Sequence, residues 1–493
     1  MAEPINFPSQ EQPASPSPTG GGEPTPNNSF VGQPPIPPVA APPAPTAPPA
    51  PMPTPSSKRK FPKIILVILA ALALTGLAFF AIKFLFKGKV PGVENKITWW
   101  GLWEEASVIN PIIEEYQTSH PGVKIEYVKQ SHKDYRDRLE NALSKGDGPD
   151  IFSFHNSWVP MFKDKLDKVP ASVVGPAEFA QVYYPVVSSD LTSGAGFVGI
   201  PLMYDGLTLF INEDIFEAAG KPPPITWDDV RDLGKALTVK DEEGLITQSG
   251  VALGLTTNVD HWPEIIALMM LQNGAKLAQP SGELAEKAVD FYTIFYKEDR
   301  VWDENMPPST IAFAAGKVAM YFGTSWRAFE IKQQNPELRF KTIPLPRLPK
   351  DIPTQPDVSY ASYWAQGVWT KSTKKDAAWE FLKFAASGQS LEKMYASASQ
   401  LRLFGQPYPR VDMAELLSTH PIVGSIIVQA PDAQSWYLAD RTFDGPTGIN
   451  SQIKKYFEDA INAVNEGKSI EKSLETAALG VVEVLSRYGI GRQ

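Results

Sequence analysis

The pattern of apolar and polar positions predicts a β-α-β-α-β order at the start of the folded body. Continuous apolar and β-branched runs at 97–100, 123–128 and 151–154 are typical of buried strands. Between them, apolar residues recur with helical spacing over 108–116 and again over 135–143. Because strands that alternate with helices pair side by side, the pattern predicts a parallel sheet.

Turn-forming residues set the expected ends of these elements. Asn110-Pro111 predicts the start of the first helix, and His120-Pro121-Gly122 its end. Trp103 and two carboxylates follow the first strand directly. Ligands of open α/β sheets bind beyond the carboxyl ends of the strands, so a ligand cleft is expected there.

The N-terminal residues differ in composition from this body. Residues 1–57 hold 19 of the 47 prolines and no Trp, and they predict a disordered tail. An uncharged run follows, and we expect a transmembrane helix over 64–86. A cleaved signal peptide is the alternative; the 63 residues before the run and the absence of a clear cleavage site argue against it. Four basic residues precede the run and three follow it, which favours a cytoplasmic N-terminus and an extracellular body at the plasma membrane.

Charge and cysteine content exclude several function classes. The chain has no Cys, which excludes disulfides, thiol catalysis and cysteine-based zinc sites. Residues 90–493 carry 39 basic and 52 acidic side chains, a poor composition for binding nucleic acid.

Catalysis is not indicated either. Glu104-Glu105 has no identifiable partner carboxylate for glycoside hydrolysis, so we expect no enzyme. The five His show no metal-ligand spacing and are interpreted as solvated or structural; no metal and no cofactor is predicted. Ala315-Gly316-Lys317-Val318 lacks the first glycine and the Ser/Thr of a phosphate-binding loop, so any ATPase must be a separate protein.

Several sequence blocks together resemble one family. They are the Ile-Thr-Trp-Trp strand, HPGVKIEYV, YRDRLENALSKGDGPDIF, GIPLMYDGLTLFINEDIFEAAG, PPPITWDDVRDLGKALT, FAAGKVAMYFGTSW, KSTKKDAAWEFLKFAAS and AINAVNEGKSIEKSLETAALGVVEVL. In this order and spacing they resemble the family 1 extracellular solute-binding proteins of ABC importers, a maltose-binding-protein-like superfamily. The resemblance covers about Lys96–Tyr488.

The resemblance implies an α/β fold of two lobes, the type II periplasmic-binding-protein-like fold, with a ligand cleft between the lobes. The solute-binding domain would span 96–493. The first lobe would comprise about 97–203 and 362–415, and the second about 204–361 and 416–493. Hinges are expected near Pro201–Asp205 and Tyr360–Gln366.

The resemblance also implies a function. A membrane-anchored extracellular protein would capture a sugar or oligosaccharide by lobe closure and deliver it to an ABC permease with a separate ATPase. The alternative is a sensor or surface-adhesion ectodomain of the same fold.

Tryptophans and nearby polar residues are the candidate ligand contacts. Aromatic planes cover the apolar faces of a sugar ring, while carboxylates and amides bind its hydroxyls. By resemblance, the candidate ligand-binding positions are Trp103, Glu104, Phe154, Asn156, Trp158, Asp205, Trp262, Trp326 and Trp436. Trp364, near the second hinge, and Arg402, where the late helices of the first lobe approach the cleft, are added by their position.

Core packing is the alternative for each Trp. Trp379, among Phe381, Leu382 and Phe384 on one helix, is expected in the core. Trp227 is expected to pack at a helix start. Trp364, near the second hinge, is open to both roles.

Overall fold

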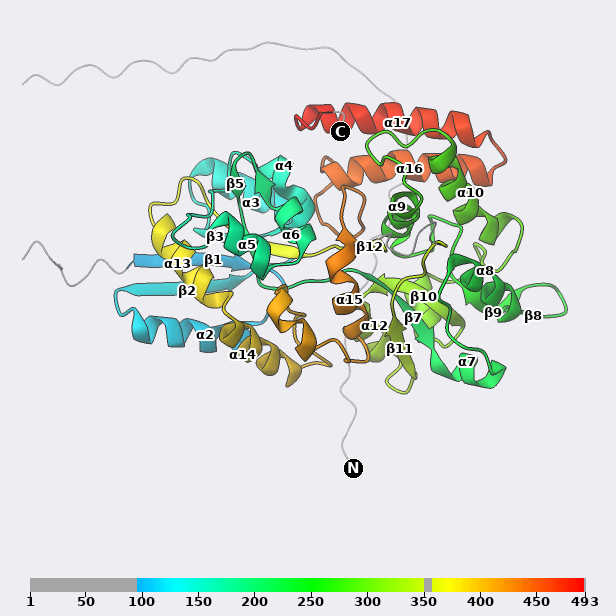
Figure 1. Cartoon of the computed structure of the whole chain (residues 1–493), viewed down its shortest axis with the longest axis horizontal. Helices are drawn as coiled ribbons and strands as arrows, with labels where there is room; N and C mark the ends of the chain where they lie inside the picture. Colours follow the sequence, from blue (N-terminus) through cyan, green and yellow to red (C-terminus); the bar gives the residue numbers. More distant parts are fainter. Residues whose placement is uncertain (1–94, 350–356, 492–493) are drawn as a thin grey trace, which may run out of the picture. The chain divides into compact units, whose positions relative to one another are not determined.

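The computed structural model describes residues 95–349 and 357–491, which belong to one compact unit. Two five-stranded sheets with flanking helices form two lobes (Figure 1). The predicted tail 1–57 and the predicted helix 64–86 lie outside the described residues. Within the described ranges, no helix is both long and apolar enough to cross a membrane.

The first lobe is built on a sheet whose strands come from distant parts of the chain. In spatial order they are β2 (Val123–Lys129), β1 (Asn95–Gly101), β3 (Ile151–His155), β13 (Trp364–Val368) and β6 (Ile200–Pro201). β1 runs parallel to β2 and β3, with Ile97 opposite Ile125 and Trp99 opposite Ile151. The predicted parallel β-α-β-α-β order is therefore confirmed.

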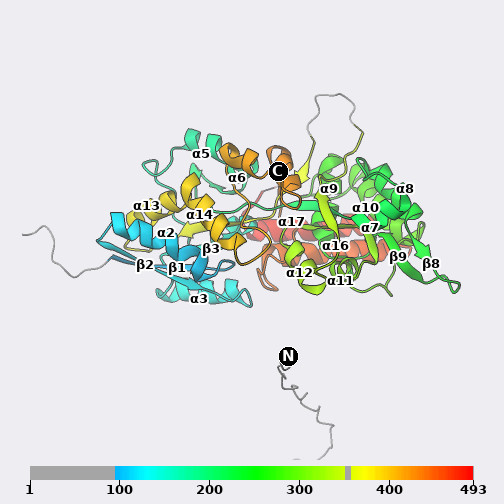
Figure 2. The ribbon, with the colours of Figure 1, turned by 90° about the horizontal axis from the view of Figure 1, so that it is seen from below.

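Helices cover both faces of this sheet, and Figure 2 shows α2 and α3 on opposite sides of β1 and β2. The main helices are α2 (Ala106–Ser119), α3 (Tyr135–Lys145), α13 (Lys375–Ala385) and α14 (Gly388–Ser399). Short elements complete the lobe: η1 (Asn156–Trp158), α4 (Val159–Phe162), α5 (Pro176–Val182), α6 (Pro185–Asp190), β4 (Thr192–Ser193), β5 (Gly196–Phe197) and η2 (Val411–Leu416).

One predicted helix boundary is wrong. Helix α2 begins at Ala106, ahead of Asn110-Pro111, and Pro111 lies inside it. As the sixth residue of the helix, Pro111 removes the backbone hydrogen bond to Ser107 and crowds its carbonyl. Val108 and Ile109, buried at 2% exposure each, anchor the extra turn in the core. Burial of these side chains outweighs the proline signal.

The second lobe surrounds a sheet that is more deeply buried. Its strands, in spatial order, are β11 (Phe340–Ile343), β7 (Leu207–Asn212), β10 (Val318–Thr324), β9 (Ile246–Val251) and β8 (Val239–Lys240). Every residue of β7 and β10 is buried, which explains their near-continuous apolar sequences.

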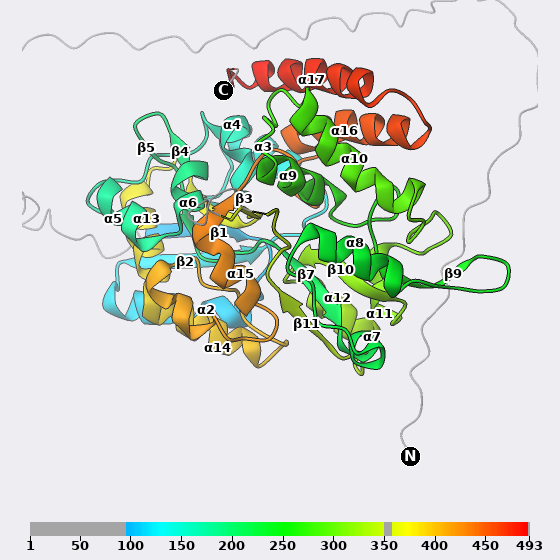
Figure 3. The same ribbon diagram turned by 45° about the vertical axis from the view of Figure 1, so that its right-hand side comes forward.

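The helices of the second lobe include the C-terminal pair, and Figure 3 shows α10, α16 and α17 lying in successive layers. They are α7 (Glu213–Ala219), α8 (Trp227–Ala236), α9 (Trp262–Gln272), α10 (Glu283–Lys297), α11 (Ser309–Ala314), α12 (Arg327–Gln334), α15 (Gly424–Gln429), η3 (Ala430–Asp432), α16 (Ile449–Asn465) and α17 (Ile470–Arg487). Trp227 begins α8 and is 3% exposed, and Trp379 of α13 is fully buried, so both predicted core positions are confirmed.

Two crossings of the chain between the lobes lie side by side. The chain leaves β6 for β7 through 202–206 and returns through 361–363. The Ser362 amide donates to the Asp205 carbonyl at 3.0 Å, and Gly206 pairs with Ala361. A Cβ at Gly206 would lie 2.6 Å from the Tyr360 carbonyl oxygen, so only glycine permits this approach. Beside them, β12 (Ser359–Tyr360) pairs with β14 (Ala433–Gln434).

Candidate ligand-binding cavity

A cavity of about 350 Å³ lies between the lobes. Strand ends supply much of its wall. Trp103 follows β1, His155 ends β3, and Thr324 ends β10 with Trp326 just beyond it. The volume falls in the range of small-molecule sites, and the position beyond strand ends is the one that ligands take in α/β folds.

The first-lobe wall is mainly aromatic. Trp364 is 6% exposed, and its ring centroid lies 5.4 Å from Trp103 and 5.3 Å from His155. Phe443 joins this cluster from the C-terminal part of the chain, 5.8 Å from Trp103 and 4.6 Å from His132. These rings present apolar surface with few hydrogen-bonding atoms.

The second-lobe wall is a network of charges around one indole. Trp326 lies against two guanidinium groups, with Arg327 at 4.5 Å and Arg441 at 5.2 Å from its ring centroid. Arg327 is 1% exposed and pairs with Glu330 at 2.7 Å and Asp260 at 3.5 Å. These ion pairs within the second lobe hold the Arg327 guanidinium against the indole.

Hydrogen bonds through His261 fix the carboxylate of Glu264. Arg327 Nε can only donate, so His261 Nε2 accepts its hydrogen bond at 2.8 Å. The ring proton of a neutral His261 then sits on Nδ1 and points to Glu264 Oε1, 3.3 Å away. The Asp440 amide donates to the same oxygen at 2.8 Å. Glu264 is therefore held in one orientation on the cavity wall.

Asp205 lies where the crossing segments meet the second lobe. Its Oδ1 accepts hydrogen bonds from the Gly206 amide at 2.7 Å and the Ser325 amide at 3.1 Å. Burial raises the pKa of this carboxyl to about 6, against the lowering effect of the same hydrogen bonds. Asp205 thus links the hinge to the end of β10 on the cavity wall.

Residues 402–406 close another side of the cavity. Arg402 Nη2 bonds Glu104 Oε1 at 2.5 Å, and its guanidinium carbon lies 5.4 Å from the Phe329 ring centroid. Phe404 packs on the same Phe329 ring at 4.5 Å. This segment therefore contacts α12 of the second lobe.

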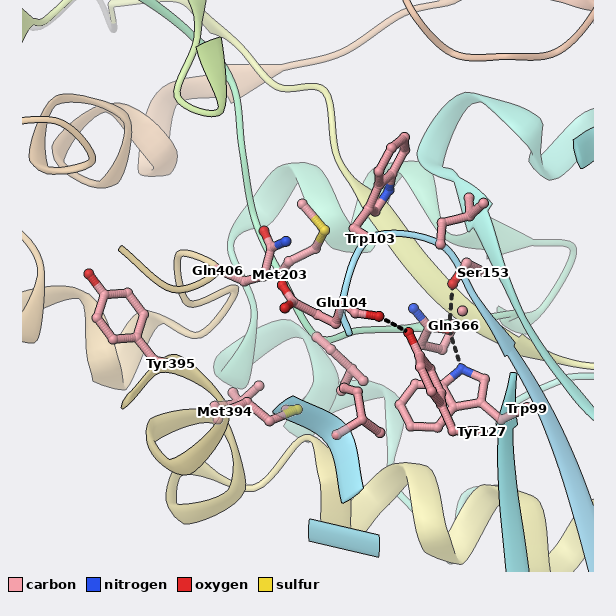
Figure 4. Close-up of a pocket in the computed structure, with 15 residues that line it drawn as sticks. Trp99, Trp103, Glu104, Tyr127, Ser153, Met203, Gln366, Met394, Tyr395 and Gln406 are labelled. Atoms are coloured by element: carbon pink, nitrogen blue, oxygen red, sulfur yellow. Dashed lines mark hydrogen bonds between the residues drawn. The ribbon is translucent and has the colours of Figure 1, made fainter. Parts of the chain in front are cut away.

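A smaller side cavity of about 50 Å³ adjoins the first-lobe wall (Figure 4). Trp103 and Glu104 extend in different directions from neighbouring positions, as Figure 4 shows. Tyr127 donates from its hydroxyl to the Glu104 carbonyl at 2.7 Å. Gln366 Oε1 accepts from Trp99 Nε1 at 2.9 Å, so the floor of the side cavity is fixed by hydrogen bonds.

Comparison with known proteins assigns the chain to a family. The model of the bacterial extracellular solute-binding protein family matches residues 100–389. The chain belongs to this family. It is a family of binding proteins, not of enzymes, in agreement with the sequence prediction.

Individual relatives are distant. The chain is 22% identical over 309 residues to a maltotriose-binding protein of Pyrococcus abyssi, covering 59% of this chain and 62% of the relative. It is 24% identical over 287 residues to the diacetylchitobiose-binding protein DasA of Streptomyces coelicolor, covering 54% and 62%. The chain thus spans about three-fifths of the length of these relatives. The sugar-binding protein MalE of Xanthomonas citri has the same fold, with a TM-score of 0.64, 19% identity and coverage of 80% and 98%.

Five of the predicted contacts line the interlobe cavity of this solute-binding protein: Trp103, Asp205, Trp326, Trp364 and Arg402. Glu104 lines the side cavity and pairs with Arg402. The structure therefore brings six of the eleven candidates to the same region.

Three predicted contacts from the third strand and the turn after it lie off the wall. Phe154 is fully buried and fills the space over Gly199 and Gly367. Trp158 is fully buried and stacks on Phe162. The Asn156 side-chain amide donates a hydrogen bond to Asp190 at 2.9 Å, and its carbonyl oxygen accepts a hydrogen bond from a backbone amide. Packing and turn closure occupy these side chains.

Two further candidates also lie off the cavity wall. Trp262 is 3% exposed at the start of α9, with Lys454 Nζ 6.0 Å from its ring centroid. Trp436 packs against Tyr437 at 5.7 Å and its backbone amide donates to the Tyr360 hydroxyl.

Sequence reasoning missed part of the wall. His132, His155 and His261 line the cavity, although all His were assigned solvated or structural roles. His261 and Glu264 lie beside Trp262 in NVDHWPE, the stretch from which only the tryptophan was selected as a candidate. Residues 440–443 carry no periodic pattern, and no feature of the sequence marks them.

Proposed function

We propose that this protein captures a sugar or oligosaccharide between its lobes and delivers it to an ABC permease powered by a separate ATPase. The observation that carries this proposal is the cavity itself, aromatic on the first-lobe wall and charged on the second. Sugar rings have apolar faces and a rim of hydroxyls, and the two walls suit these two parts.

The names of the relatives support the same class of ligand. One binds maltotriose and another diacetylchitobiose, both oligosaccharides. The wall's charges are mostly paired with one another, which favours a neutral ligand over an anion.

Lobe closure would provide the mechanism. A ligand that contacts Trp103 and Trp326 together meets both surfaces only in the closed form, so its differential affinity drives closure. The paired crossings at 202–206 and 361–363 are the proposed hinge, as their place between the sheets suggests. The lobe boundaries expected from the sequence, at 203/204, 361/362 and 415/416, stay part of this proposal.

The sequence before the described residues would tether the domain. The apolar run within 64–86 is long enough for one membrane span, and it would hold the binding domain outside the cell beside its permease. Tethering replaces diffusion of a free binding protein by a high effective concentration.

A thermal-shift screen of the full chain in detergent tests the proposal. The panel comprises mono- and oligosaccharides, polyols, amino acids and small anions. A ligand at a hundred times its Kd stabilises the protein by about 2.7 kcal/mol, which raises Tm visibly. We expect a carbohydrate among the hits and a smaller radius of gyration in its presence.

Matched tryptophan variants locate the site. Trp326→Ala should abolish the carbohydrate response, while Trp436→Ala, off the cavity wall, should retain it. Hits confined to anions or amino acids would contradict the proposed ligand class.

A further inference from the structure

The segment 440–444 lines the interlobe cavity in an unusual backbone conformation. Asp440, Arg441 and Phe443 are all lining residues of the cavity. Arg441 and Phe443 each have a φ of 51°, in the left-handed region that large side chains rarely adopt. Backbone strain of this kind persists only where neighbouring groups hold it, and it clusters in segments that contact ligands.

The two strained residues face different lobes. Arg441 lies over the indole of Trp326 on the second-lobe wall, 5.2 Å from its ring centroid. Phe443 lies against the first-lobe wall, where its ring centroid is 5.8 Å from that of Trp103 and 4.6 Å from that of His132. The segment therefore contacts both walls of the cavity within three residues.

The C-terminal end of the segment is fixed by hydrogen bonds. Asp444 is 1% exposed, and its carboxylate accepts hydrogen bonds from the Asn450 amide and the Ser451 hydroxyl of α16, each at 2.7 Å. Arg136 of α3 in the first lobe donates to the Asp444 carbonyl at 2.8 Å. Side chain and backbone of Asp444 are thus both held.

The N-terminal end is fixed through Asp440. Its amide donates to Glu264 Oε1 at 2.8 Å, and its Oδ1 accepts a hydrogen bond from Lys454 Nζ at 2.8 Å. Burial by itself would raise the pKa of this carboxyl, but the neighbouring cations, Lys454 first among them, lower it to about 2. The Asp440 carboxylate is therefore ionised at neutral pH and paired with a cation.

Lys454 acts on the cavity from behind the segment. It belongs to α16, its side chain is 33% exposed, and it is not among the residues that line the cavity. The ion pair is not needed to fix α16 itself, because Ile453, Phe457 and Ile461 already bury the apolar face of this helix. What the ion pair with Asp440 adds is a fixed start for the strained segment.

We infer that the 440–444 segment is a clasp that joins the two walls of the cavity, and that Lys454 is the positioning residue that holds it there. This inference rests on the proposed function and extends it to a residue outside the cavity lining. While the clasp is held, Arg441 and Phe443 keep their places on opposite walls. Without the Lys454 ammonium, the strained backbone relaxes and both side chains move.

The first test follows hydrogen exchange in the unliganded full chain. Lys454→Met removes the charge and keeps a side chain of similar shape. We expect exchange of the backbone amides at 440–444 to become about 10-fold faster, because the strained segment loses an anchor and opens more often. The matched control is Lys455→Met, the same change at the next residue of α16, where the side chain is 63% exposed and pairs with Asp459. Exchange at 440–444 should be unaltered in this control.

The second test measures binding of the carbohydrate that gives the largest thermal shift. Lys454→Met should bind it about 10-fold more weakly by calorimetry, because the apparent Kd rises as the population with the clasp in place falls. Lys455→Met should bind like the unaltered protein. Lys454→Arg keeps the positive charge and should restore the affinity to within about 3-fold. If Lys454→Met does not fold, Lys454→Gln, which can still donate a hydrogen bond but carries no charge, takes its place.

The outcomes separate the two proposals. If exchange at 440–444 or the affinity is the same in Lys454→Met and in the unaltered protein, this inference is overturned and the proposed function stands. A loss of affinity that Lys455→Met shares, or that Lys454→Arg does not reverse, also overturns it. An unaltered protein that binds no carbohydrate overturns the proposed function and, with it, the role given to the clasp.

Discussion

The two walls of the interlobe cavity differ in what holds them in place. Trp364 on the first-lobe wall is fixed by packing against Trp103, Trp158 and His155. Trp326 on the second-lobe wall is fixed by cations and carboxylates. Packed rings supply a shaped apolar surface, and a charge network supplies oriented hydrogen-bonding groups. One cavity thus combines an apolar surface of defined shape on one lobe with oriented polar groups on the other.

The largest expected effect comes from truncating Trp364 on the first-lobe wall, with Trp326 on the second-lobe wall as the comparison. Trp364→Ala should lower the free energy of unfolding by about 3–5 kcal/mol, because a buried indole leaves a cavity. Trp326→Ala should lower it by about 1–2 kcal/mol, since this indole is partly exposed and loses mainly its contacts with the two guanidinium groups. Urea unfolding measures both, and equal losses would contradict the proposed difference between the walls.

The next effect tests the charge network. Arg327→Met should lower the free energy of unfolding by about 3 kcal/mol, because it leaves Asp260 and Glu330 without their buried cation. Arg441→Met is the matched control; this side chain is 40% exposed, and its loss should cost less than about 1 kcal/mol. If Arg327→Met leaves the free energy of unfolding unchanged, packing and not charge holds this wall in place.

Differences in pH dependence are expected to be smaller than the losses at Trp364 and Arg327. Burial raises the pKa of Asp205 to about 6, so the folded state binds the extra proton between pH 4 and 6 and loses stability as pH rises through that window. Between pH 4 and pH 7, the free energy of unfolding of Asp205→Asn should therefore rise by about 2 kcal/mol relative to that of the unaltered protein.

On the first-lobe wall, stability should change with pH in the opposite direction. Burial lowers the pKa of His155 to about 3, so the unfolded state takes the proton first and stability falls as pH drops below 6.5. At pH 5, the free energy of unfolding of His155→Asn should have fallen by about 2 kcal/mol less than that of the unaltered protein. Unfolding free energies at several pH values test both variants; differences that stay constant with pH would contradict the assigned causes.

Local patterns predicted the sheet of the first lobe well. The expected strands at 97–100, 123–128 and 151–154 each extend only one to three residues further in the structure. A buried strand leaves a strong signal because every residue in a short run must be apolar. The start of α2 was missed because burial of Val108 and Ile109 overrides the local signal of Pro111.

The cavity wall was only partly predictable. Trp103 and Trp326 follow strands directly, so their place beyond a sheet edge could be inferred from neighbouring residues. Trp158 and Trp262 have similar surroundings in the sequence but pack into the lobes. Which side of a turn an indole takes depends on tertiary neighbours such as Phe162, which periodicity does not reveal.

The wall is assembled from stretches as distant as Trp103 and Phe443. During synthesis, the ribosome must therefore release some 340 residues between these two before the cavity has its full lining. A nascent chain that still lacks Asp440 also lacks the amide that orients Glu264. The complete cavity lining, and with it the fixed position of Glu264, therefore forms only after this late segment has been synthesised.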